Sequence, residues 1–510
     1  MNFVRQIDER FENSTERLFD FTHDQLKLVN EYGVENTFLL QYDVLCDERF
    51  VSMFKKEATD HTELGLWYEI VEPLTSACGL PYRSEKGWKY DWHIIPGFSM
   101  GYTPRERELL IDEAMRKFKE TFGYYPKTVA SWLIDTHTVN YLTERYHVDT
   151  LAICRDQANT DAYTLLGGYF NQAYYPSKNN VFTPAQSEEI QVNVPVFRLL
   201  GPCPIHNFDK YGKIKYASEE MKQREKACFT LEPGWYPGRT PEIVNWFFDT
   251  YYGEESLGFA YAQIGQENGF MNFKEQVFSG MRIQIEQLLS RGDVTFTKMR
   301  DAGVLFKTKY PKQTPATAVT ALKNWDSADV QSVYYDCKNY TANLFRFEDT
   351  VFFRSLFLFD ERVRDRYMEI PCETFDAVYE NLPIIDTLRC SEEDQKQCGL
   401  KIFTEGSSFE TERLSDGVLR VSFGADFAVF YEDRIVVKAN RMLCYGNSLV
   451  NSVEKENNAL RFQHRGFTYR FAIQNADVTL LDNGNIDIVP NSDTVVLYPL
   501  RDGLDDGNII

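Results

Sequence analysis

Residues 128–156 read TVASWLIDTHTVNYLTERYHVDTLAICRD and contain the unit from which the fold is predicted. Two short apolar runs, 128–135 and 150–156, flank a segment whose apolar residues recur with helical spacing. The unit is therefore expected to form a strand, a helix and a second strand that lies parallel to the first. Both apolar runs end in an aspartate, Asp135 and Asp156.

Similar units occur on both sides of this stretch. A helix is predicted over 104–122, because Thr103 and Glu106 form a capping box, proline follows Thr103 and Gly123 is suited to end the helix. About seven strand–helix repeats predict an α/β fold, a seven-stranded β/α barrel. Further strands are predicted at residues 36–44, 64–70, 91–97, 196–201, 257–264 and 293–299.

Polar residues end several of the predicted strands. In a parallel barrel the carboxyl ends of all strands open at one mouth, where the site of such proteins lies. Acids that are far apart in the sequence are therefore expected to converge there. These acids are Asp43, Glu69, Asp135, Asp156 and Glu267.

The character of the sequence changes near residue 325. Beyond it, alternating runs of β-forming residues are separated by turn residues such as 481–485 (LDNGN). This change predicts two domains, a β/α barrel catalytic domain over 1–325 and a β-sandwich-like domain over 326–510. No catalytic constellation stands out in the second domain, so we expect it to be a structural or sugar-contacting accessory.

Composition excludes several classes of function. The 510 residues carry a net charge of −21, which argues against nucleic acid as a partner because phosphate binding needs a basic face. No apolar run is long enough for a membrane span. Aromatic residues make up 15% of the chain, and their rings suit a neutral carbohydrate substrate, although they also suit the filling of a core.

The ten cysteines are scattered without a CxxC pair. This pattern predicts buried, reduced thiols in preference to a zinc knuckle. The first residues, MNFVRQIDERFENSTERLF, are charged and lack the apolar core of a signal peptide, so a cytoplasmic protein is expected. The sequence leaves the oligomeric state open.

Paired carboxylates are the catalytic chemistry that the motifs favour. The seven histidines show no metal-ligand spacing and no GxSxG motif occurs, so neither a metal nor another cofactor is expected. Glycoside hydrolysis needs one ionised and one protonated carboxyl group. Helix amides would favour the ionised form of Asp135, for which a plain N-cap is the alternative. Glu267 lies between two glycines that let a ligand approach, or in a solvated turn.

Aromatic and polar side chains near the predicted strand ends are candidates for contacting a sugar. For each of them, a buried core position or an ordered loop is the alternative interpretation. The candidates are Trp67, Glu69, Trp92, His93, Trp132, His137, Asp156, Glu232, Trp235 and Asn268.

The order of these motifs resembles a known superfamily. Residues 36–300 are similar to the superfamily that joins polysaccharide deacetylases to glycoside hydrolase families 38 and 57, which has a seven-stranded β/α barrel. Residues 131–135 (SWLID) resemble the Trp-Leu-Pro-Glu strand of family 57, whose last residue is the nucleophile. Residues 41–43 resemble the first-strand motif, 63–67 the second-strand motif, and 265–269 occupy the position of a later acidic motif.

The resemblance implies roles for three acids. Asp135 would be the nucleophile or base, Glu267 the proton donor, and Asp43 would orient the substrate or tune the pKa of a neighbour. The sequence departs from the pattern, because Asp replaces Glu at 135 and Gln41 replaces a histidine. As a whole, the chain resembles a bacterial family with this barrel followed by a C-terminal β domain.

A sugar-directed hydrolase that needs no metal is therefore predicted, and two alternatives stay open. The first is a metal-dependent carbohydrate deacetylase that uses Asp43 with His93 or His137. Trp67 and Val71 stand where such a deacetylase would carry its two histidines. The second is a non-catalytic barrel that binds a glycan.

Overall fold

The computed structural model describes most of the chain. No helix in this described part is long and apolar enough to cross a membrane. The described residues are 1–6, 13–83, 97–154, 157–160, 163–165, 167–206, 230–253, 256–325, 329–374, 377, 379–387, 397–405, 408–446, 452–457 and 459–499.

The N-terminal part is built on a parallel sheet covered by helices, and this α/β class was predicted. The strand order is β1-β2-β3-β4-β5-β8, and every pair is parallel. The strands are short apolar runs that are buried almost throughout, as strands covered on both faces require. They are β1 (Asn2–Val4), β2 (Asn36–Leu40), β3 (Thr62–Trp67), β4 (Thr128–Ala130), β5 (Thr150–Ile153) and β8 (Val196–Arg198).

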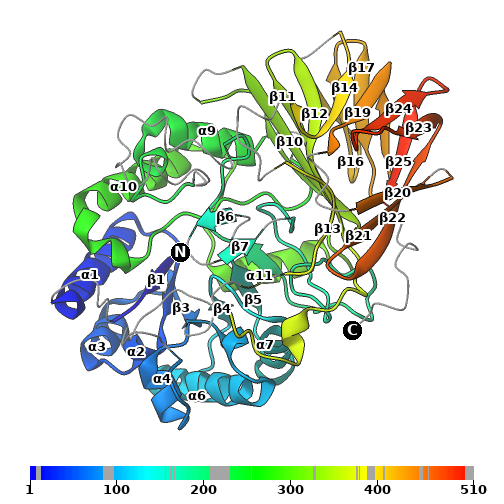
Figure 1. Ribbon diagram of the computed structural model, residues 1–510. Helices are drawn as coiled ribbons and strands as arrows, with labels where there is room; N and C mark the ends of the chain where they lie inside the picture. The colour runs from blue at the N-terminus through cyan, green and yellow to red at the C-terminus, as the bar shows by residue number, and fades with distance from the viewer. Residues whose placement is uncertain are drawn as a thin grey trace.

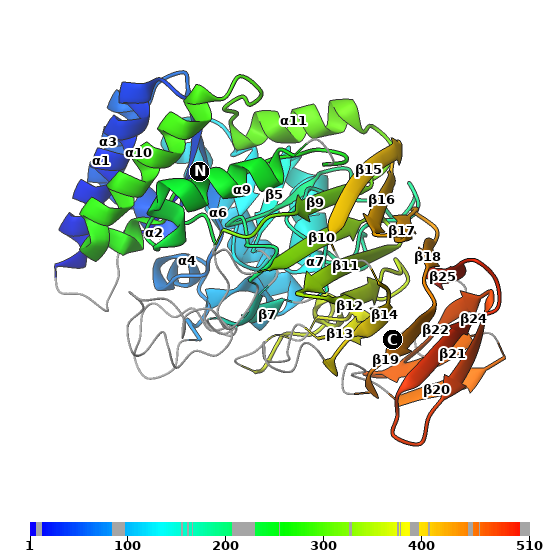
Figure 2. The same ribbon diagram turned by 90° about the horizontal axis from the view of Figure 1, so that it is seen from above.

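Helices connect these strands and pack against them. In Figure 2, α1, α3 and α10 lie at one end of the molecule and α11 crosses above β5. The predicted capping box is present in α6, where Thr103 accepts from the backbone N–H of Glu106 and Gly123 ends the helix in a left-handed conformation. The principal helices are α1 (Ser14–Tyr32), α3 (Glu48–Glu57), α6 (Pro104–Phe122), α7 (Thr136–Tyr141), α9 (Pro241–Tyr251), α10 (Lys274–Ser290) and α11 (Met299–Lys309).

A closed seven-stranded barrel is not confirmed, because the described sheet is an open row of six strands with β1 and β8 at its edges. The predicted strands at 257–264 and 293–299 do not pair with any described strand, and the prediction at 91–97 lies outside the described residues except for Gly97. Residues 258–264, which we call the strap, lie between β8 and β1. The carbonyl of Ile264 accepts from the amino group of Met1 at 2.6 Å, and strap side chains bond the other end. The Tyr261 hydroxyl donates to the carbonyl of Arg198 and accepts from its N–H, at 2.7 and 2.8 Å.

The C-terminal part is all-β and antiparallel, as predicted (Figure 1). Its two sheets share one apolar core. The first sheet contains β9 (Thr317–Ala321), β10 (Val330–Asp336), β11 (Tyr340–Phe347), β12 (Thr350–Leu358), β13 (Leu382–Asp386), β14 (Leu400–Phe403), β19 (Arg441–Cys444), β23 (Ala476–Leu480) and β24 (Ile486–Pro490). The second contains β15 (Phe409–Ser415), β16 (Val418–Phe423), β17 (Asp426–Phe430), β18 (Ile435–Lys438), β20 (Ser452–Glu456), β21 (Ala459–His464), β22 (Phe467–Gln474) and β25 (Val495–Pro499).

The two parts meet along a buried interface. Apolar side chains of α9, including Phe247 and Phe248, pack in one cluster with Tyr334 and Phe352 of the first antiparallel sheet. Strand β9 pairs with β10 although it precedes the predicted boundary at residue 325, which stays a prediction.

Helix α11 packs closely on β5, and Gly303 permits this contact. A Cβ added at Gly303 would lie 2.6 Å from the carbonyl oxygen of Asp149 and closer still to Oγ1 of Thr150. Because this wall is backbone, Gly303→Ala should lower the free energy of unfolding by about 1–3 kcal/mol, measured by urea denaturation. Gly292→Ala, whose Cβ meets open space, is the control and should leave the stability unchanged. Equal stability of the two variants would contradict this packing.

Candidate active site

Three of the predicted acids lie together at the carboxyl edge of the parallel sheet. Asp43 follows β2, Glu69 follows β3, and Glu267 lies between the strap and a short 3₁₀ helix, Asn268–Phe273. Arg5, the first residue after β1, contacts two of them. Because the strands are parallel, residues that follow β1, β2 and β3 reach the same edge of the sheet.

Arg5 bridges Glu69 and Glu267. Its Nη2 lies 3.0 Å from Oε2 of Glu267 and 3.8 Å from Oε2 of Glu69. These two carboxyl oxygens therefore lie within about 7 Å of each other, a spacing compatible with two-carboxylate hydrolases. Asn268 holds the backbone of Arg5, accepting from its N–H at 3.1 Å and donating to its carbonyl at 2.8 Å.

Glu69 is an acid of this cluster whose protonation is altered by its surroundings. Its residue is 6% exposed, and Nε2 of Gln41 donates to its Oε2 at 2.9 Å. Burial raises the pKa of Glu69 to about 7, and the neighbouring carboxylates of Glu267 and Asp43 act in the same direction. Arg5 opposes this shift only in part. Near neutral pH this carboxyl group therefore exchanges between its protonated and ionised forms.

Asp43, just after β2, supports the cluster from the side of that strand. It is buried, and its Oδ2 accepts from the backbone N–H of Gln6 at 3.2 Å. This bond fixes the chain just beyond Arg5. Asp43 thus helps to hold the end of β1 in place. Its expected role, to orient the substrate or to tune the pKa of a neighbour, stays a prediction.

Glu232 and Trp235 lie on a loop that is connected to Glu267 through its neighbour Gln266. Nε2 of Gln266 donates to Oε1 of Glu232 at 3.0 Å, and its Oε1 accepts from the N–H of Gly234 at 2.8 Å. Nε1 of Trp235 donates to Oε2 of Glu232 at 3.2 Å. Both side chains are half-buried, so this loop offers a polar and aromatic surface beside the acids.

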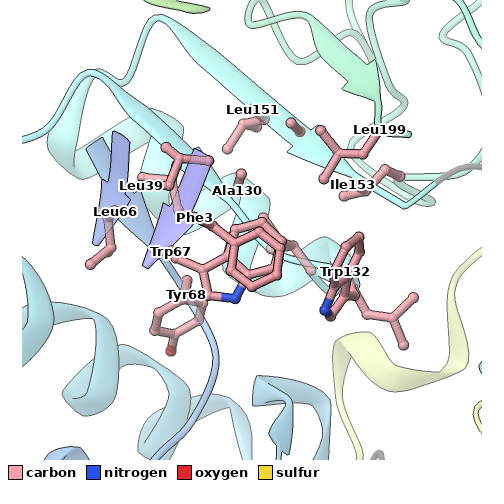
Figure 3. Close-up of a cluster of buried hydrophobic side chains, with 14 of the residues drawn as sticks. Phe3, Leu39, Leu66, Trp67, Tyr68, Ala130, Trp132, Leu151, Ile153 and Leu199 are labelled. Carbon is pink, nitrogen blue, oxygen red and sulfur yellow. The ribbon is translucent and has the colours of Figure 1, made fainter. Parts of the chain in front are cut away.

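Trp67 and Trp132 form an aromatic cluster with Phe3 (Figure 3). The ring of Trp67 stacks on Phe3 with centroids 4.1 Å apart, and Trp132 meets both rings edge-on, at 5.0 and 5.2 Å. Trp67 is 1% exposed and Trp132 is 8% exposed. These contacts favour a role in packing at the ends of β1, β3 and β4 over an open stacking face for a sugar.

Asp135 lies in a different environment from the acid cluster. It is fully buried as the N-cap of α7. Its Oδ1 accepts from Nη1 of Arg107 at 2.8 Å and from the N–H of Thr138 at 3.0 Å. Its Oδ2 accepts from the hydroxyls of Ser99 and Thr138, at 2.6 and 2.7 Å. Burial opposes ionisation, but Arg107 and the hydroxyl donors outweigh it and lower the pKa of Asp135.

The Arg107–Asp135 pair also holds the segment that connects β12 and β13. Arg107 donates to the carbonyls of Tyr367 and Ile370 in that segment. Beside it, Oδ2 of Asp365 accepts from the hydroxyl of Thr136, the first residue of α7, at 2.7 Å. The ion pair therefore joins the α/β part to the β part, and this position favours a structural role for Asp135 over attack on a substrate.

The other predicted contacts fall elsewhere. Nε2 of His137 lies 3.5 Å from Oε1 of Glu108. This pair is separate from the acids that Arg5 contacts. Trp92, His93 and Asp156 lie outside the described residues. Within the described ranges, no group of three or more His, Cys, Asp or Glu is arranged to hold a metal ion.

Sequence reasoning missed two members of this site, Arg5 and Gln41 as a partner of Glu69. Arg5 was missed because β1 has only three residues, NFV, too few to show a periodic pattern. Gln41 carries no local signal for its bond to Glu69, because the two residues are 28 positions apart in the chain.

Comparison with known proteins supports the fold. No protein-family model and no curated protein matches the chain. The structure is similar to a protein from Parabacteroides distasonis, provisionally described as a glycoside hydrolase/deacetylase, with 14% identity and a TM-score of 0.51 over 74% of this chain and 86% of that one. A Mycobacterium smegmatis protein, provisionally described as a polysaccharide deacetylase, matches with 11% identity and a TM-score of 0.34 over 57% and 78%. The first similarity confirms, at the level of fold, the resemblance predicted from the motif order.

The buried ion pair of Asp135 leads to a test of its role. Asp135→Asn should lower the free energy of unfolding by about 3–5 kcal/mol, because it leaves the Arg107 charge buried without a counter-ion. Chemical denaturation measures this loss. The control is Asp433→Asn, which removes an exposed ion pair with Arg434 and should cost about 1 kcal/mol or less. Unchanged stability of Asp135→Asn together with lost turnover would instead support the nucleophile role.

Proposed function

We propose that this protein is a hydrolase that acts on carbohydrate by a two-carboxylate mechanism centred on Glu69 and Glu267. The observation that carries the proposal is the Arg5-bridged pair, in which one carboxyl has a pKa of about 7 and its neighbour is held in an ion pair. The fold of the P. distasonis protein, whose description names glycoside hydrolase/deacetylase, is consistent with it.

In this mechanism Glu69 is the proton donor. Its raised pKa keeps a large fraction protonated near neutral pH, which a general acid needs for transfer to the glycosidic oxygen. Gln41 fixes the orientation of this carboxyl. After the bond breaks, the ionised Glu69 is stabilised by the Arg5 guanidinium.

Glu267 is the ionised partner in this proposal. Its contact with Nη2 of Arg5 favours the carboxylate form, which can attack the anomeric carbon or activate a water molecule. Trp235 and Glu232 would contact the sugar beside it, because Gln266 holds their loop against this part of the chain. Asp135, whose oxygens are all engaged, serves as a positioning residue for α6 and α7.

The role of Glu69 is tested by its amide. Glu69→Gln should lower kcat/KM for aryl glycosides or oligosaccharides by about 10²–10⁴-fold, because the amide cannot donate the acid proton. Glu63→Gln is the matched control, since Glu63, within β3 itself, is also a buried glutamate with a raised pKa. It lies at the opposite end of that strand, where it accepts from Thr37 and Thr128, and its amide should leave turnover unchanged.

Several outcomes would contradict the proposal. Normal turnover by Glu69→Gln would remove the assignment of this residue. Release of acetate with no cleavage of any glycoside by the wild-type protein would point to a deacetylase. Sugar binding without any product would point to the non-catalytic alternative.

The pH dependence provides a separate test. The protonated fraction of Glu69 falls as the pH rises through about 7, so kcat/KM should fall on the alkaline side with an apparent pKa near that value. Arg5 lowers the pKa of Glu69, so Arg5→Met should shift this alkaline limb to higher pH, whereas Arg5→Lys should largely restore it. An alkaline limb that stays in place in Arg5→Met would show that another group titrates.

A further inference from the structure

A cavity of about 510 Å³ lies outside the acid cluster. It is enclosed by the strap, the end of β8, residues 293–297 and one face of α11. The residues of the acid cluster and of its neighbouring loop do not line this cavity. They are Arg5, Gln41, Asp43, Glu69, Glu232, Trp235, Gln266, Glu267 and Asn268. The volume is in the range of sites that bind small molecules.

The walls of this cavity are largely aromatic and aliphatic. The strap contributes Phe259 and Tyr261, the neighbouring loop contributes Phe296, and α11 contributes Met299 and Leu305. Every residue of the strap is half-buried. Flat apolar faces of this kind suit the C–H face of a ring.

Hydrogen-bonding groups without protein partners also face this region. Among the described residues, no hydrogen bond involves the backbone N–H or C=O groups of 259–261, since the strap is joined to β8 through side chains. Oδ1 of Asn36, a lining residue only 5% exposed, likewise has no partner in the described part of the chain. Buried acceptors normally find a partner, so Oδ1 of Asn36 indicates a ligand that donates a hydrogen bond. The strap backbone is half-buried and can bond the same ligand.

The charged groups of the wall are already engaged. Glu35 pairs with Lys298 at 3.1 Å and with His61 at 3.0 Å. Asp293 pairs with Arg291 at 3.1 Å, and Lys309 donates to the carbonyl of Gly258 at 3.0 Å. Arg198 donates to the carbonyls of Cys154 and Tyr169, and the amino group of Met1 donates to the carbonyl of Ile264. Each charged group that lines the cavity therefore already contacts a protein partner, and the rest of the wall is apolar or neutral.

We propose that this cavity is a binding site for a neutral sugar of one or two rings, separate from the catalytic acids. A sugar ring combines an apolar C–H face with hydroxyl groups, which matches the aromatic walls and the unpaired strap backbone. The inference goes beyond the proposed hydrolysis and does not require it, because binding at this site needs none of the residues around Glu69.

The test fills the cavity from a helix that also offers a matched control. Leu305 lines the cavity and is 52% exposed, whereas Val304, its neighbour on α11, is 44% exposed and does not line it. Both positions should therefore tolerate tryptophan without loss of folding. Ala260→Trp fills the cavity from the opposite wall, which covers the case in which the tryptophan at position 305 turns outward.

Calorimetric titration of the full chain with glucose, N-acetylglucosamine and cellobiose, in the Glu69→Gln background to prevent turnover, measures the binding. At least one sugar should lose tenfold or more in affinity for one site in Leu305→Trp or Ala260→Trp, and Val304→Trp should bind as the parent does. Absence of binding by all three sugars, or affinities unchanged in both filled variants, would overturn the proposal. Stronger binding of glucuronate than of glucose would also contradict it.

The titration separates this proposal from the proposed function. If the protein is a hydrolase with a second site, two binding events are expected and the filled variants lose only one. If the catalytic proposal fails, a single event remains and the filled variants lose it. Failure of the cavity proposal instead leaves one event that the filled variants retain.

Discussion

The buried ion pair between Arg107 and Asp135 is the contact on which the arrangement of the two parts depends. A guanidinium enclosed at zero exposure must have all its charge and its N–H groups compensated. Here one carboxylate and the carbonyls of several segments do this together, including Tyr367 and Ile370 from the β part. The pair thereby holds α6, the start of α7 and the β12–β13 connection in one place, next to the carboxyl edge of the sheet.

Two buried carboxyl groups at this edge show how the neighbours of a carboxyl group change the effect of burial on its pKa. Asp135 has Arg107 at 2.8 Å and further hydroxyl donors, and its pKa is lowered in spite of full burial. Glu69 has Arg5 only at 3.8 Å and other carboxylates beside it, and its pKa rises to about 7. A charge fully paired inside the protein is well suited to structure, whereas a group that titrates near neutrality is suited to proton transfer. These differences support Glu69 as the proposed catalytic centre and favour a structural role for Asp135.

The strap explains why the sheet stays open between β8 and β1. Its apolar sequence suits a strand, yet the strap bonds the neighbouring backbone with its side chains. Tyr261 bonds Arg198 at the end of β8, and Gln263 bonds Leu200 just beyond it. At its end Gly265 adopts a φ of +126°, and a Cβ there would overlap the backbone of Met1. The strap is thus fixed at both ends without a ladder of hydrogen bonds. The cavity lies beside this unpaired segment.

Local sequence determined the elements whose signals lie within a few residues. The capping box of α6, the short buried strands β2 to β5 and the antiparallel character of the C-terminal part follow from periodicity and capping. Local sequence also predicted acids at the ends of strands. These acids come together because parallel strands bring their carboxyl ends to one edge of the sheet. Only the tertiary structure decided which acid faces which arginine, that 257–264 remains unpaired, and that β1, with three residues, joins the sheet. The reason is physical: pKa values and strand pairing depend on distances between groups far apart in the chain, and no local pattern encodes those distances.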